Sequence, residues 1–278
     1  MKLSIITVNY NNKAGLQKTI DSVVAQTWRD FEWIIIDGGS TDGSKELIEQ
    51  YQQHFAYWCS EPDKGVYNAM NKGIGRARGE YLNFMNSGDI FYSKDTLEEV
   101  FARNILNADM IYGDWVRIEK ENIVLMKAPN KVSLEFFYTD NICHQAMFLK
   151  SSTMKKRSYD ETFQIYADWA RWMEMALDGL VFQYVPVTIC CFDATEGLSN
   201  KITSNLDMEK ERMRTMISNP IREILNHNIE YKNELDKYRN NQLVQDVYSL
   251  INDYPLYYKW IRLNIIFLKL LKKIFPPK

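Results

Sequence analysis

Short apolar runs alternate with amphipathic segments through the first hundred residues, and this order constrains the fold more than any other feature of the chain. Residues 3–8 (Leu-Ser-Ile-Ile-Thr-Val) are rich in β-branched side chains, as buried parallel strands are. A stripe of apolar residues at helical spacing follows: Leu16, Ile20, Val23 and Val24. Residues 33–37 and 81–85 repeat the strand pattern, and each leads through a turn into another helical segment. This order predicts an α/β fold with a mainly parallel, doubly wound sheet flanked by helices, whose ligands bind outside the carboxyl ends of the strands.

The second half of the chain changes character twice. Residues 110–112, 115–118 and 123–126 are short strand-like runs, separated by the turn-like pairs Gly113-Asp114 and Glu121-Asn122. Beyond residue 205 the strand signals stop, and charged residues interleave with apolar residues at helical spacing. We therefore expect an α/β domain over residues 1–205 and a helical carboxy-terminal extension over residues 206–278.

Composition and charge exclude several classes of protein. The 278 residues are 46% hydrophobic and 25% charged, close to the globular average, which argues against a disordered chain or a disulfide scaffold. The net charge of −2 excludes nucleic-acid binding by bulk basicity. The four cysteines have no metal-binding spacing, and the sequence shows no signal-peptide pattern and no run of 18 apolar residues. We therefore expect reduced thiols, a cytoplasmic location and no nucleic-acid partner.

Three carboxylates fall at predicted strand ends or loops on the ligand side of the sheet: Asp37, Asp63 and Asp89. The two glycines after Asp37 allow a ligand to approach the backbone, although an ordinary turn between strand and helix explains them equally well. Residues 86–89 (Asn-Ser-Gly-Asp) also have the composition of a turn. One carboxylate among neutral oxygens is nevertheless a common way to hold Mg²⁺ or Mn²⁺ when substrate phosphates supply the other ligands.

Asp168 opens an amphipathic segment that runs to Leu177. Aspartate is favoured at a helix start because it caps the helix and complements its dipole, so a structural role suffices to explain it. The same carboxylate could act as a general base if an acceptor hydroxyl came within hydrogen-bond reach. Trp169 beside it is of a type that stacks on sugars, although aromatic residues on a helix more often belong to the core.

Other motifs are absent or have the wrong context. Residues 73–79 contain three glycines, but their spacing is GxGxxxG and they lie between a helix and a strand, the reverse of a dinucleotide-binding fingerprint. His144 follows Cys143, whereas a cysteine–histidine nucleophile pair acts across space, so we expect no cysteine hydrolase. A structural role and a site role for His144 both stay open.

Four segments in order carry a resemblance to a known family. They are residues 4–11 (Ser-Ile-Ile-Thr-Val-Asn-Tyr-Asn), 36–43 (Ile-Asp-Gly-Gly-Ser-Thr-Asp-Gly), 63–73 (Asp-Lys-Gly-Val-Tyr-Asn-Ala-Met-Asn-Lys-Gly) and 86–89. Together they resemble glycosyltransferase family 2, the inverting GT-A enzymes, and look closest to bacterial transferases of colanic-acid-type polysaccharide assembly. The resemblance runs from about residue 3 to residue 200 and implies a GT-A fold with a Rossmann-like central sheet.

The resemblance also implies a role for each matching residue. The nucleotide-sugar donor, most often a UDP-sugar in this family, would be bound by Thr7, Tyr10, Asp37, Ser40, Asp63, Asn71, Asn86 and Ser87. Asp89 would hold a divalent metal, Mn²⁺ or Mg²⁺, against the diphosphate, and Asp168 would deprotonate the acceptor hydroxyl. Apart from the resemblance, we expect His144 and Trp169 on the acceptor side. The implied reaction transfers a sugar to a glycan or lipid-linked acceptor in cell-surface polysaccharide biosynthesis.

The sequence departs from the family pattern at three positions. Asn86 and Gly88 replace aspartates that are common in the metal-binding segment, and Ala167 replaces a glutamate often found before the base. These departures are the support for one alternative, a sugar-nucleotide-binding protein without catalysis. A nucleotidyltransferase is a second alternative, but it would normally have a Gly-rich, basic amino-terminal loop, which this chain lacks.

The last segment, residues 254–278, carries six basic and no acidic side chains among apolar and aromatic ones. This pattern is typical of an amphipathic helix on an anionic membrane surface, so we expect peripheral binding at the inner face of the plasma membrane. Packing on the chain's own domain or in a homodimer is the alternative. Truncation near Tyr254 should lower binding to anionic liposomes, and unchanged binding would refute the membrane role.

Overall fold

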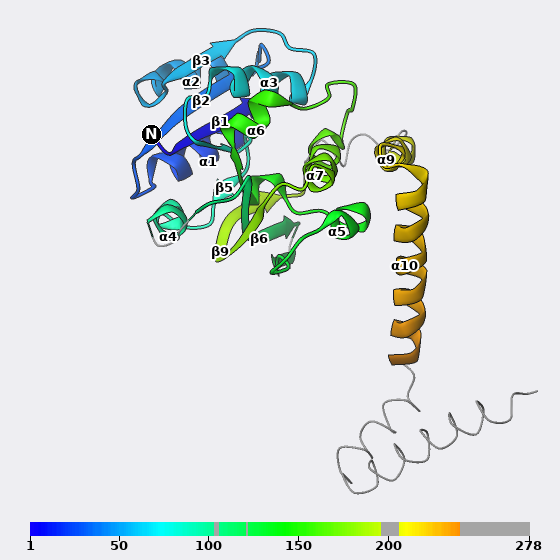
Figure 1. Cartoon of the computed structure of the whole chain (residues 1–278). Coiled ribbons are helices and arrows are strands. Elements are labelled where there is room, and N and C mark those ends of the chain that lie inside the picture. The colour runs from blue at the N-terminus through cyan, green and yellow to red at the C-terminus, as the bar shows by residue number, and fades with distance from the viewer. Residues whose placement is uncertain (103–105, 121, 196–205, 240–278) are drawn as a thin grey trace, which may run out of the picture. The chain divides into compact units, whose positions relative to one another are not determined.

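A computed structural model describes residues 1–102, 106–120, 122–195 and 206–239 (Figure 1). The chain divides into two compact units, Met1–Met216 and Ile217–Lys278. The predicted boundary at residue 205 and the basic segment 254–278 lie outside the described residues. Among the described residues, no helix is both long and apolar enough to cross a membrane.

The first unit contains the sheet and most of the helices. Its strands are β1 (Leu3–Asn9), β2 (Phe31–Asp37), β3 (Tyr57–Ser60), β4 (Tyr81–Phe84), β5 (Ile90–Phe91), β6 (Met110–Glu119), β7 (Asn122–Met126), β8 (Met147–Lys150) and β9 (Phe182–Asp193). Its helices are α1 (Lys13–Val24), α2 (Ser44–Gln50), η1 (Gln52–His54), α3 (Val66–Arg76), α4 (Thr96–Phe101), α5 (Leu134–Thr139), η2 (His144–Ala146), α6 (Ser151–Lys156), α7 (Ala167–Leu177) and α9 (Leu206–Thr215). The described part of the second unit is a single helix, α10 (Asn219–Arg239).

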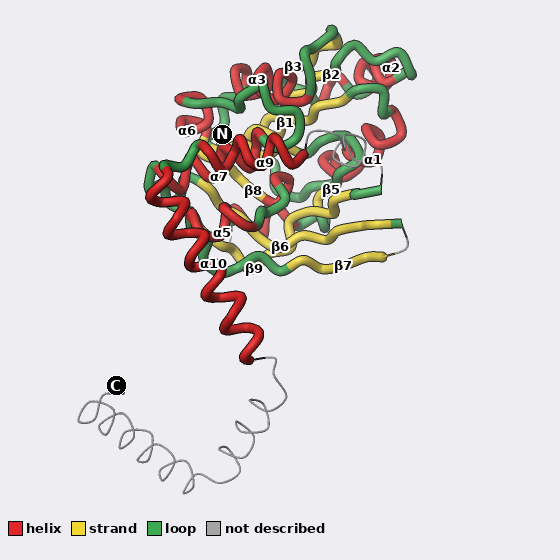
Figure 2. The backbone as a smooth tube through the Cα atoms, turned by 90° about the vertical axis from the view of Figure 1, so that its right-hand side faces the viewer, coloured by secondary structure: helices red, strands yellow, loops and turns green. Residues whose placement is uncertain are grey.

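The strands form one sheet in the order β3-β2-β1-β4-β8-β6-β9-β5, with β7 paired to β6 (Figure 2). The first four strands in this order are parallel, with β1 between β2 and β4. Beyond β4 the sheet becomes mixed, because β8 is antiparallel to both β4 and β6, and β5 is antiparallel to β9. The predicted α/β fold is confirmed, and its parallel part coincides with the βαβ segment of the sequence, where crossover helices join the strands.

The prediction of a turn at Gly113-Asp114 is wrong, because β6 runs straight through these residues. The register between β6 and β9 shifts on both sides of Asp114, which marks a bulge rather than a turn. A Cβ on Gly113 would lie 2.4 Å from the carbonyl oxygen of Val187. The glycine therefore permits β9 to approach β6 closely, which a sequence pattern cannot distinguish from a turn.

Helices α1 and α3 connect the parallel strands and bury one face each. The buried side of α1 includes Leu16, Ile20 and Val23, the stripe that the sequence predicts. Helix α3 contacts β1 and β2, with Gly73 against Ile6 of β1. Both strands are buried along nearly their whole length, so the helices and the sheet share one core. This core fixes the strand ends at which the candidate site lies.

Candidate active site

The carboxyl ends of β1, β2 and β4 meet at one edge of the sheet. Asn9 at the end of β1 is the register partner of Asp37 at the end of β2. Beyond β4, the backbone N–H of Ser87 donates to the carbonyl of Val8 at 3.1 Å, so residues 86–89 follow the end of β1. The chain positions singled out in the sequence are thus brought together, as a doubly wound sheet requires.

Asp37 organises this edge through four hydrogen bonds to its buried carboxylate. Oδ1 accepts from Asn9 Nδ2 at 2.7 Å and from Ser40 Oγ at 2.5 Å. Oδ2 accepts from the Ser40 backbone N–H at 2.9 Å and from Ser60 Oγ at 2.6 Å. Burial by itself would raise the pKa of Asp37, but these hydrogen bonds outweigh it and hold the pKa below its usual value. The ionised carboxylate therefore ties β1, β3 and the loop after β2 together.

Tyr10 and Asp63 close over Gly38, the residue after Asp37. A Cβ on Gly38 would lie 2.6 Å from Asp63 Oδ2 and 3.2 Å from the Tyr10 ring. Asp63 Oδ1 accepts from the Gly65 backbone N–H at 2.8 Å. Tyr10 is 67% exposed, so its ring offers a free aromatic surface beside the strand end. Glycine at position 38 is what lets both side chains come this near the backbone.

The loop of residues 86–89 is held against α1. Asn12 caps α1 by accepting from the Gly15 backbone N–H, and its Nδ2 donates to the Ser87 carbonyl at 3.0 Å. Thr19 Oγ1, inside α1, donates to the Asp89 carbonyl at 2.8 Å. Gly88 has a φ of 108°, a backbone conformation that favours glycine. This glycine stands at a position that the family pattern gives to an aspartate, and the turn explains it.

The Asp89 carboxylate is 5% exposed, and among the described residues it has two hydrogen-bond donors, both neutral. Oδ2 accepts from Gln145 Nε2 at 2.5 Å, and Oδ1 accepts from the Asp193 backbone N–H at 3.4 Å. Burial raises the pKa of Asp89 to about 6, although the Gln145 hydrogen bond and the nearby His144 lower it. A cation beside this carboxylate would compensate for its desolvation.

The Asp89 carboxylate and the amide oxygen of Asn86 would suit a divalent metal that takes its other ligands from a substrate diphosphate. Asn86 Oδ1 is buried and has no hydrogen-bond partner among the described residues. It lies in the same turn as Asp89, whose backbone N–H donates to the Asn86 carbonyl at 3.0 Å. No group of three or more His, Cys, Asp or Glu side chains in the described ranges could hold a metal alone. Mg²⁺ commonly takes one or two protein oxygens together with substrate phosphates, which this donor set can supply.

Asp168 lies in the first turn of α7 with its side chain 12% exposed. Oδ1 accepts from the Trp169 backbone N–H at 2.8 Å and lies 3.1 Å from the Tyr67 hydroxyl. The same hydroxyl also bonds to the Ile165 carbonyl. Oδ2 lies 3.1 Å from His144 Nδ1. Burial and the charge of Asp168 raise the pKa of Tyr67 well above its usual value, so Tyr67 stays a proton donor.

His144 connects Asp168 to the loop of residues 86–89. Its Nδ1 faces Asp168, and its Nε2 lies 3.0 Å from Asn86 Nδ2. Because a carboxylate accepts and an amide nitrogen donates, this geometry fits the imidazole with a proton on Nδ1. Burial opposes protonation of His144, but the hydrogen bond and the charge of Asp168 outweigh it and raise the pKa above its usual value. The predicted base and the predicted metal-binding loop are therefore linked through one imidazole.

Besides the buried Asp37, two further predicted site residues lie in the core instead of at an open surface. Thr7 is fully buried, and its hydroxyl accepts from Trp33 Nε1 at 3.0 Å, so it supports the end of β1 from within. Trp169 is 7% exposed, and its indole N–H donates to the Phe137 carbonyl at 2.5 Å. Lys210 Nζ lies 5.3 Å from the centroid of the Trp169 ring. This packing leaves little of the Trp169 ring for stacking on a sugar.

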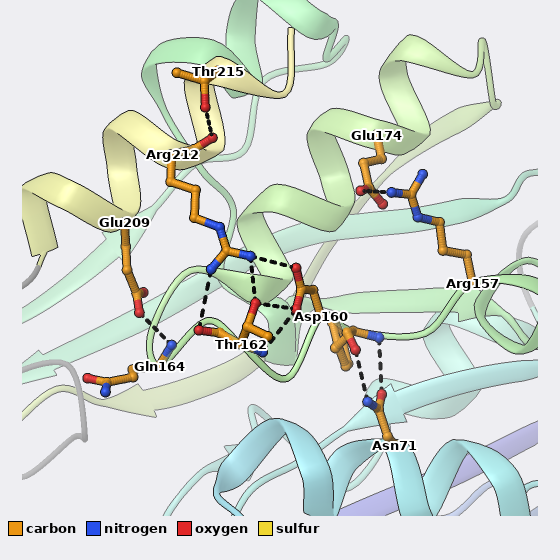
Figure 3. A network of polar contacts seen from close by, with 10 residues as sticks. Asn71, Arg157, Asp160, Thr162, Gln164, Glu174, Glu209, Arg212 and Thr215 are labelled. Atoms are coloured by element: carbon orange, nitrogen blue, oxygen red, sulfur yellow. Dashed lines mark hydrogen bonds and ion pairs between the residues drawn. The ribbon is translucent and has the colours of Figure 1, made fainter.

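Asn71 holds a loop rather than facing an open cleft (Figure 3). Its Nδ2 donates to the Tyr159 carbonyl at 2.9 Å, and its Oδ1 accepts from the Tyr159 backbone N–H at 3.0 Å. Nδ2 also donates to Glu161 Oε1 at 2.8 Å. Asn71 therefore fixes residues 157–166, the loop that leads into α7 and is called the 157–166 loop below.

Sequence reasoning missed residues that contact the predicted metal-binding carboxylate, Asp89, and the predicted base, Asp168. Gln145 donates to Asp89, and Tyr67 contacts Asp168. Tyr67 lies inside one of the segments that carry the family resemblance, but it is 101 residues from Asp168 and no spacing rule joins the two. Only the folded structure brings them together.

The sequence of this chain matches one family model and several known glycosyltransferases. Residues 4–177 match the family described as Glycosyl transferase family 2. A PGL/p-HBAD biosynthesis glycosyltransferase of Mycobacterium bovis is 30% identical over 227 residues, which cover 77% of this chain and 85% of that protein. An uncharacterized glycosyltransferase of Mycobacterium tuberculosis is 35% identical over 222 residues, covering 76% and 82% of the two chains.

Solved structures share the fold at low sequence identity. TarS 1–349 of S. aureus in complex with UDP-GlcNAc has a TM-score of 0.67 and 17% identity, covering 81% of this chain and 70% of that TarS fragment. The mannosyltransferase PcManGT of Pyrobaculum calidifontis, in complex with GDP-Man and Mn²⁺, has a TM-score of 0.55 and 12% identity, covering 100% and 88%. These likenesses concern the fold, and they confirm the predicted GT-A architecture.

Proposed function

The chain belongs to glycosyltransferase family 2 and is a glycosyltransferase, and from this premise we propose which reaction it performs. It transfers a sugar, with inversion and with metal assistance, from a UDP-sugar to a hydroxyl group of a glycan or a lipid-linked acceptor. The product serves cell-surface polysaccharide biosynthesis.

The observation that carries this proposal is the position of Asp168. Its Oδ1 accepts from the Trp169 backbone N–H and lies 3.1 Å from the Tyr67 hydroxyl, which also bonds to the Ile165 carbonyl. Among the described residues, Oδ2 contacts His144 alone. Oδ2 therefore keeps a lone pair for the acceptor hydroxyl. Through His144 the same carboxylate is linked to Asn86, in the loop that would hold the donor diphosphate. This link supports a base and a donor diphosphate on opposite sides of one reacting carbon, as a single in-line displacement requires.

Every bond, proton and electron pair in this transfer is accounted for by the two substrates and Asp168. The acceptor oxygen attacks the anomeric carbon from the side opposite the diphosphate and forms the new C–O bond, while the bond to the diphosphate oxygen breaks. The hydroxyl proton goes to Asp168 Oδ2, and the nucleoside diphosphate leaves with the electron pair. General-base assistance of this kind contributes about 10²- to 10⁴-fold in rate.

The donor would lie along the ends of β1 and β2. The exposed Tyr10 ring offers a stacking surface for the base, beside the strand ends that the hydrogen bonds of Asp37 and Ser40 hold together. The complex of TarS with UDP-GlcNAc supports a UDP-sugar, whereas that of PcManGT with GDP-Man keeps a GDP-sugar as the competing donor. Thermal-shift measurements with UDP, GDP and dTDP in the presence of Mn²⁺ separate them, since a ligand at about 100 times its Kd stabilises by about 2.7 kcal/mol.

Asp89 and Asn86 would hold the divalent metal through a carboxylate and an amide oxygen. When bound, the metal neutralises charge that develops on the leaving diphosphate. This chain would contribute the buried Asp89 carboxylate, whose desolvation favours a cation. It would also contribute the Asn86 amide oxygen, which has no hydrogen-bond partner among the described residues. The PcManGT structure with Mn²⁺ supports metal use in this fold.

The proposed acceptor and the proposed cellular location are connected. A lipid-linked acceptor requires access to a membrane surface, which the basic segment 254–278 would provide at the inner face of the plasma membrane. The name of the mycobacterial relative, PGL/p-HBAD biosynthesis glycosyltransferase, associates that protein with biosynthesis of a glycosylated product. A homodimer is the alternative use of the same segment.

Replacement of Asp168 tests the proposal. Asp168→Asn should lower the transfer rate by about 100-fold or more while nucleotide affinity stays within about twofold. Asp178→Asn, at the exposed far end of α7, is the matched control and should leave both unchanged. Full activity of Asp168→Asn would refute the base assignment. Nucleotide binding by the wild type without donor hydrolysis or transfer would instead favour a binding protein without catalysis.

A further inference from the structure

Helix α9 begins beyond the family-matching segment 4–177, yet it binds the 157–166 loop (Figure 3). The carboxylate of Glu209 accepts hydrogen bonds from three consecutive backbone N–H groups. Oε1 accepts from Gln164 at 2.6 Å, and Oε2 accepts from Ile165 at 3.0 Å and from Tyr166 at 3.3 Å. These are the three residues directly before α7, so α9 fixes the backbone from which that helix begins.

Arg212, one turn further along α9, binds the middle of the same loop (Figure 3). Its Nη2 donates to Asp160 Oδ2 at 3.0 Å and to Thr162 Oγ1 at 2.5 Å, and its Nη1 donates to the Thr162 carbonyl at 3.4 Å. The guanidinium carbon lies 4.2 Å from the centroid of the Phe163 ring. A planar guanidinium makes this set of contacts, and the compact ammonium of a lysine could not reproduce it.

Helix α3 holds the loop from its other side. Asn71 pairs with both backbone groups of Tyr159, and Asn68 Nδ2 donates to Glu161 Oε2 at 2.8 Å. Tyr67, also on α3, bonds to the Ile165 carbonyl. The loop is therefore bound by two helices at once, and its position depends on both.

One residue, Ile165, joins these contacts to the reacting carboxylate. The Ile165 N–H is bound by Glu209, and the Ile165 carbonyl is bound by the Tyr67 hydroxyl. The same hydroxyl lies 3.1 Å from Asp168 Oδ1. A shift of Ile165 would therefore move the partner of Tyr67 and change the contact that orients Asp168. Lys210, next to Glu209, also covers the Trp169 ring directly after Asp168.

We propose that Glu209 and Arg212 of α9 are positioning residues for Asp168, so that a helix outside the family-matching segment completes the active site. The inference rests on the proposed function, because it takes Asp168 as the base. Glu209 acts through Ile165 and Tyr67, and Arg212 acts by fixing the preceding part of the loop. Rate depends steeply on such geometry, since a displacement of about 1 Å can cost about 10²-fold.

A purely structural role for α9 makes a different prediction. Met213 is fully buried and anchors the helix independently of Glu209 and Arg212. If the two charged residues only stabilised the fold, their replacement would lower the melting temperature without changing kcat of the folded enzyme. If they position Asp168, kcat falls while binding of the donor is kept, because the donor-binding strand ends lie elsewhere in the unit.

The test uses the full chain and steady-state kinetics with a nucleotide-sugar donor. Glu209→Ala should lower kcat about 10- to 100-fold with KM for the donor within about twofold. Glu209→Gln should recover part of the loss, since its amide carbonyl replaces one of the two acceptor oxygens. Arg212→Lys is a second, milder variant, for which we expect a loss of about three- to tenfold. Asp207→Ala is the control for a lost carboxylate on an exposed face of α9 and should stay within about twofold.

A double-mutant cycle decides between this inference and its premise. In the Asp168→Asn background, Glu209→Ala should reduce the residual rate less than about twofold, because residues that act through one another are not additive. An equal reduction in both backgrounds, or an unchanged kcat in folded Glu209→Ala enzyme, would overturn the role of α9. If Asp168→Asn itself keeps the full rate, the proposed base fails. If Asp168→Asn is inactive and Glu209→Ala is fully active, only the inference about α9 fails.

Discussion

Gly73 and Gly75 lie two residues apart in α3 and provide a matched test of how this helix packs on the sheet. A Cβ on Gly73 would lie 2.5 Å from Ile6 Cγ2, whereas nothing lies within 4 Å of a Cβ on Gly75. Neither glycine has the positive φ that an alanine would disfavour. We predict that Gly75→Ala stabilises the first unit and that Gly73→Ala destabilises it.

The magnitudes follow from helix propensity and from the contact with Ile6. Alanine is favoured over glycine inside a helix by about 0.5–1 kcal/mol, and this gain applies to both variants. The contact at position 73 is about 1 Å or more shorter than the optimum of about 3.5–4.0 Å between carbon atoms. Ile6 is fully buried and β-branched, so its side chain cannot turn away cheaply. Overpacking of this kind costs about 1–3 kcal/mol, so the two variants should differ by that amount.

Urea denaturation followed by tryptophan fluorescence measures this difference. Six of the seven tryptophans lie in the first unit, so the signal reports mainly on the sheet and its helices. Gly73→Ala should unfold at lower urea concentration than the wild type, and Gly75→Ala at slightly higher concentration. If both variants unfolded at the same urea concentration, α3 would not lie as close to β1 as the structure places it. Because α3 carries Tyr67 and Asn71, Gly73→Ala should also lower the transfer rate.

Two further predictions concern pH and metal. Burial by itself would raise the pKa of Glu32, but hydrogen bonds from Ser4 and Arg78 and the charge of Arg78 hold this pKa below its usual value. The ionised form of Glu32 therefore stabilises the fold above about pH 4.5, and this stabilisation is lost as the pH falls through the folded-state pKa. The difference in unfolding free energy between wild type and Glu32→Gln, from urea titrations at several pH values, should therefore shrink on acidification, and a constant difference would contradict the reasoning. For Asp89, replacement by alanine should remove the Mn²⁺-dependent part of UDP affinity in calorimetry, as EDTA should for the wild type, and undiminished dependence on Mn²⁺ would refute the metal role.

The strand ends could be predicted from the sequence because they depend on local order. Alternating strands and helices place successive carboxyl ends at one edge of a parallel sheet, so Asp37 and Asp89 were expected near each other. Their hydrogen bonds were not predictable in the same way. Whether Asp37 faces a ligand or ties strands together depends on Ser60, which is 23 residues away and adjoins it only because β2 pairs with β3.

The same limit explains the residues whose surroundings differ from expectation. Thr7 lies in the segment that resembles the family's nucleotide pocket, but alternation along β1 turns its hydroxyl toward Trp33 in the core. Gly113 has the composition of a turn, but β9 approaches it from more than seventy residues away. Composition and spacing show which conformations and contacts a residue permits, but tertiary packing decides which neighbouring residue makes the contact.

By itself the sequence determined the α/β class, the alternation of strands and helices through the first hundred residues, the edge of the sheet at which the predicted site residues gather and the family to which the chain belongs. These follow from periodicity and from motifs, which are properties of neighbouring residues. Only the tertiary structure decided that His144 joins Asp168 to Asn86, that Tyr67 orients the same carboxylate and that Glu209 of α9 fixes the loop before it. The physical reason is that hydrogen bonds act over about 3 Å in space and are indifferent to separation along the chain, so such partners become neighbours only when the core has brought their elements together.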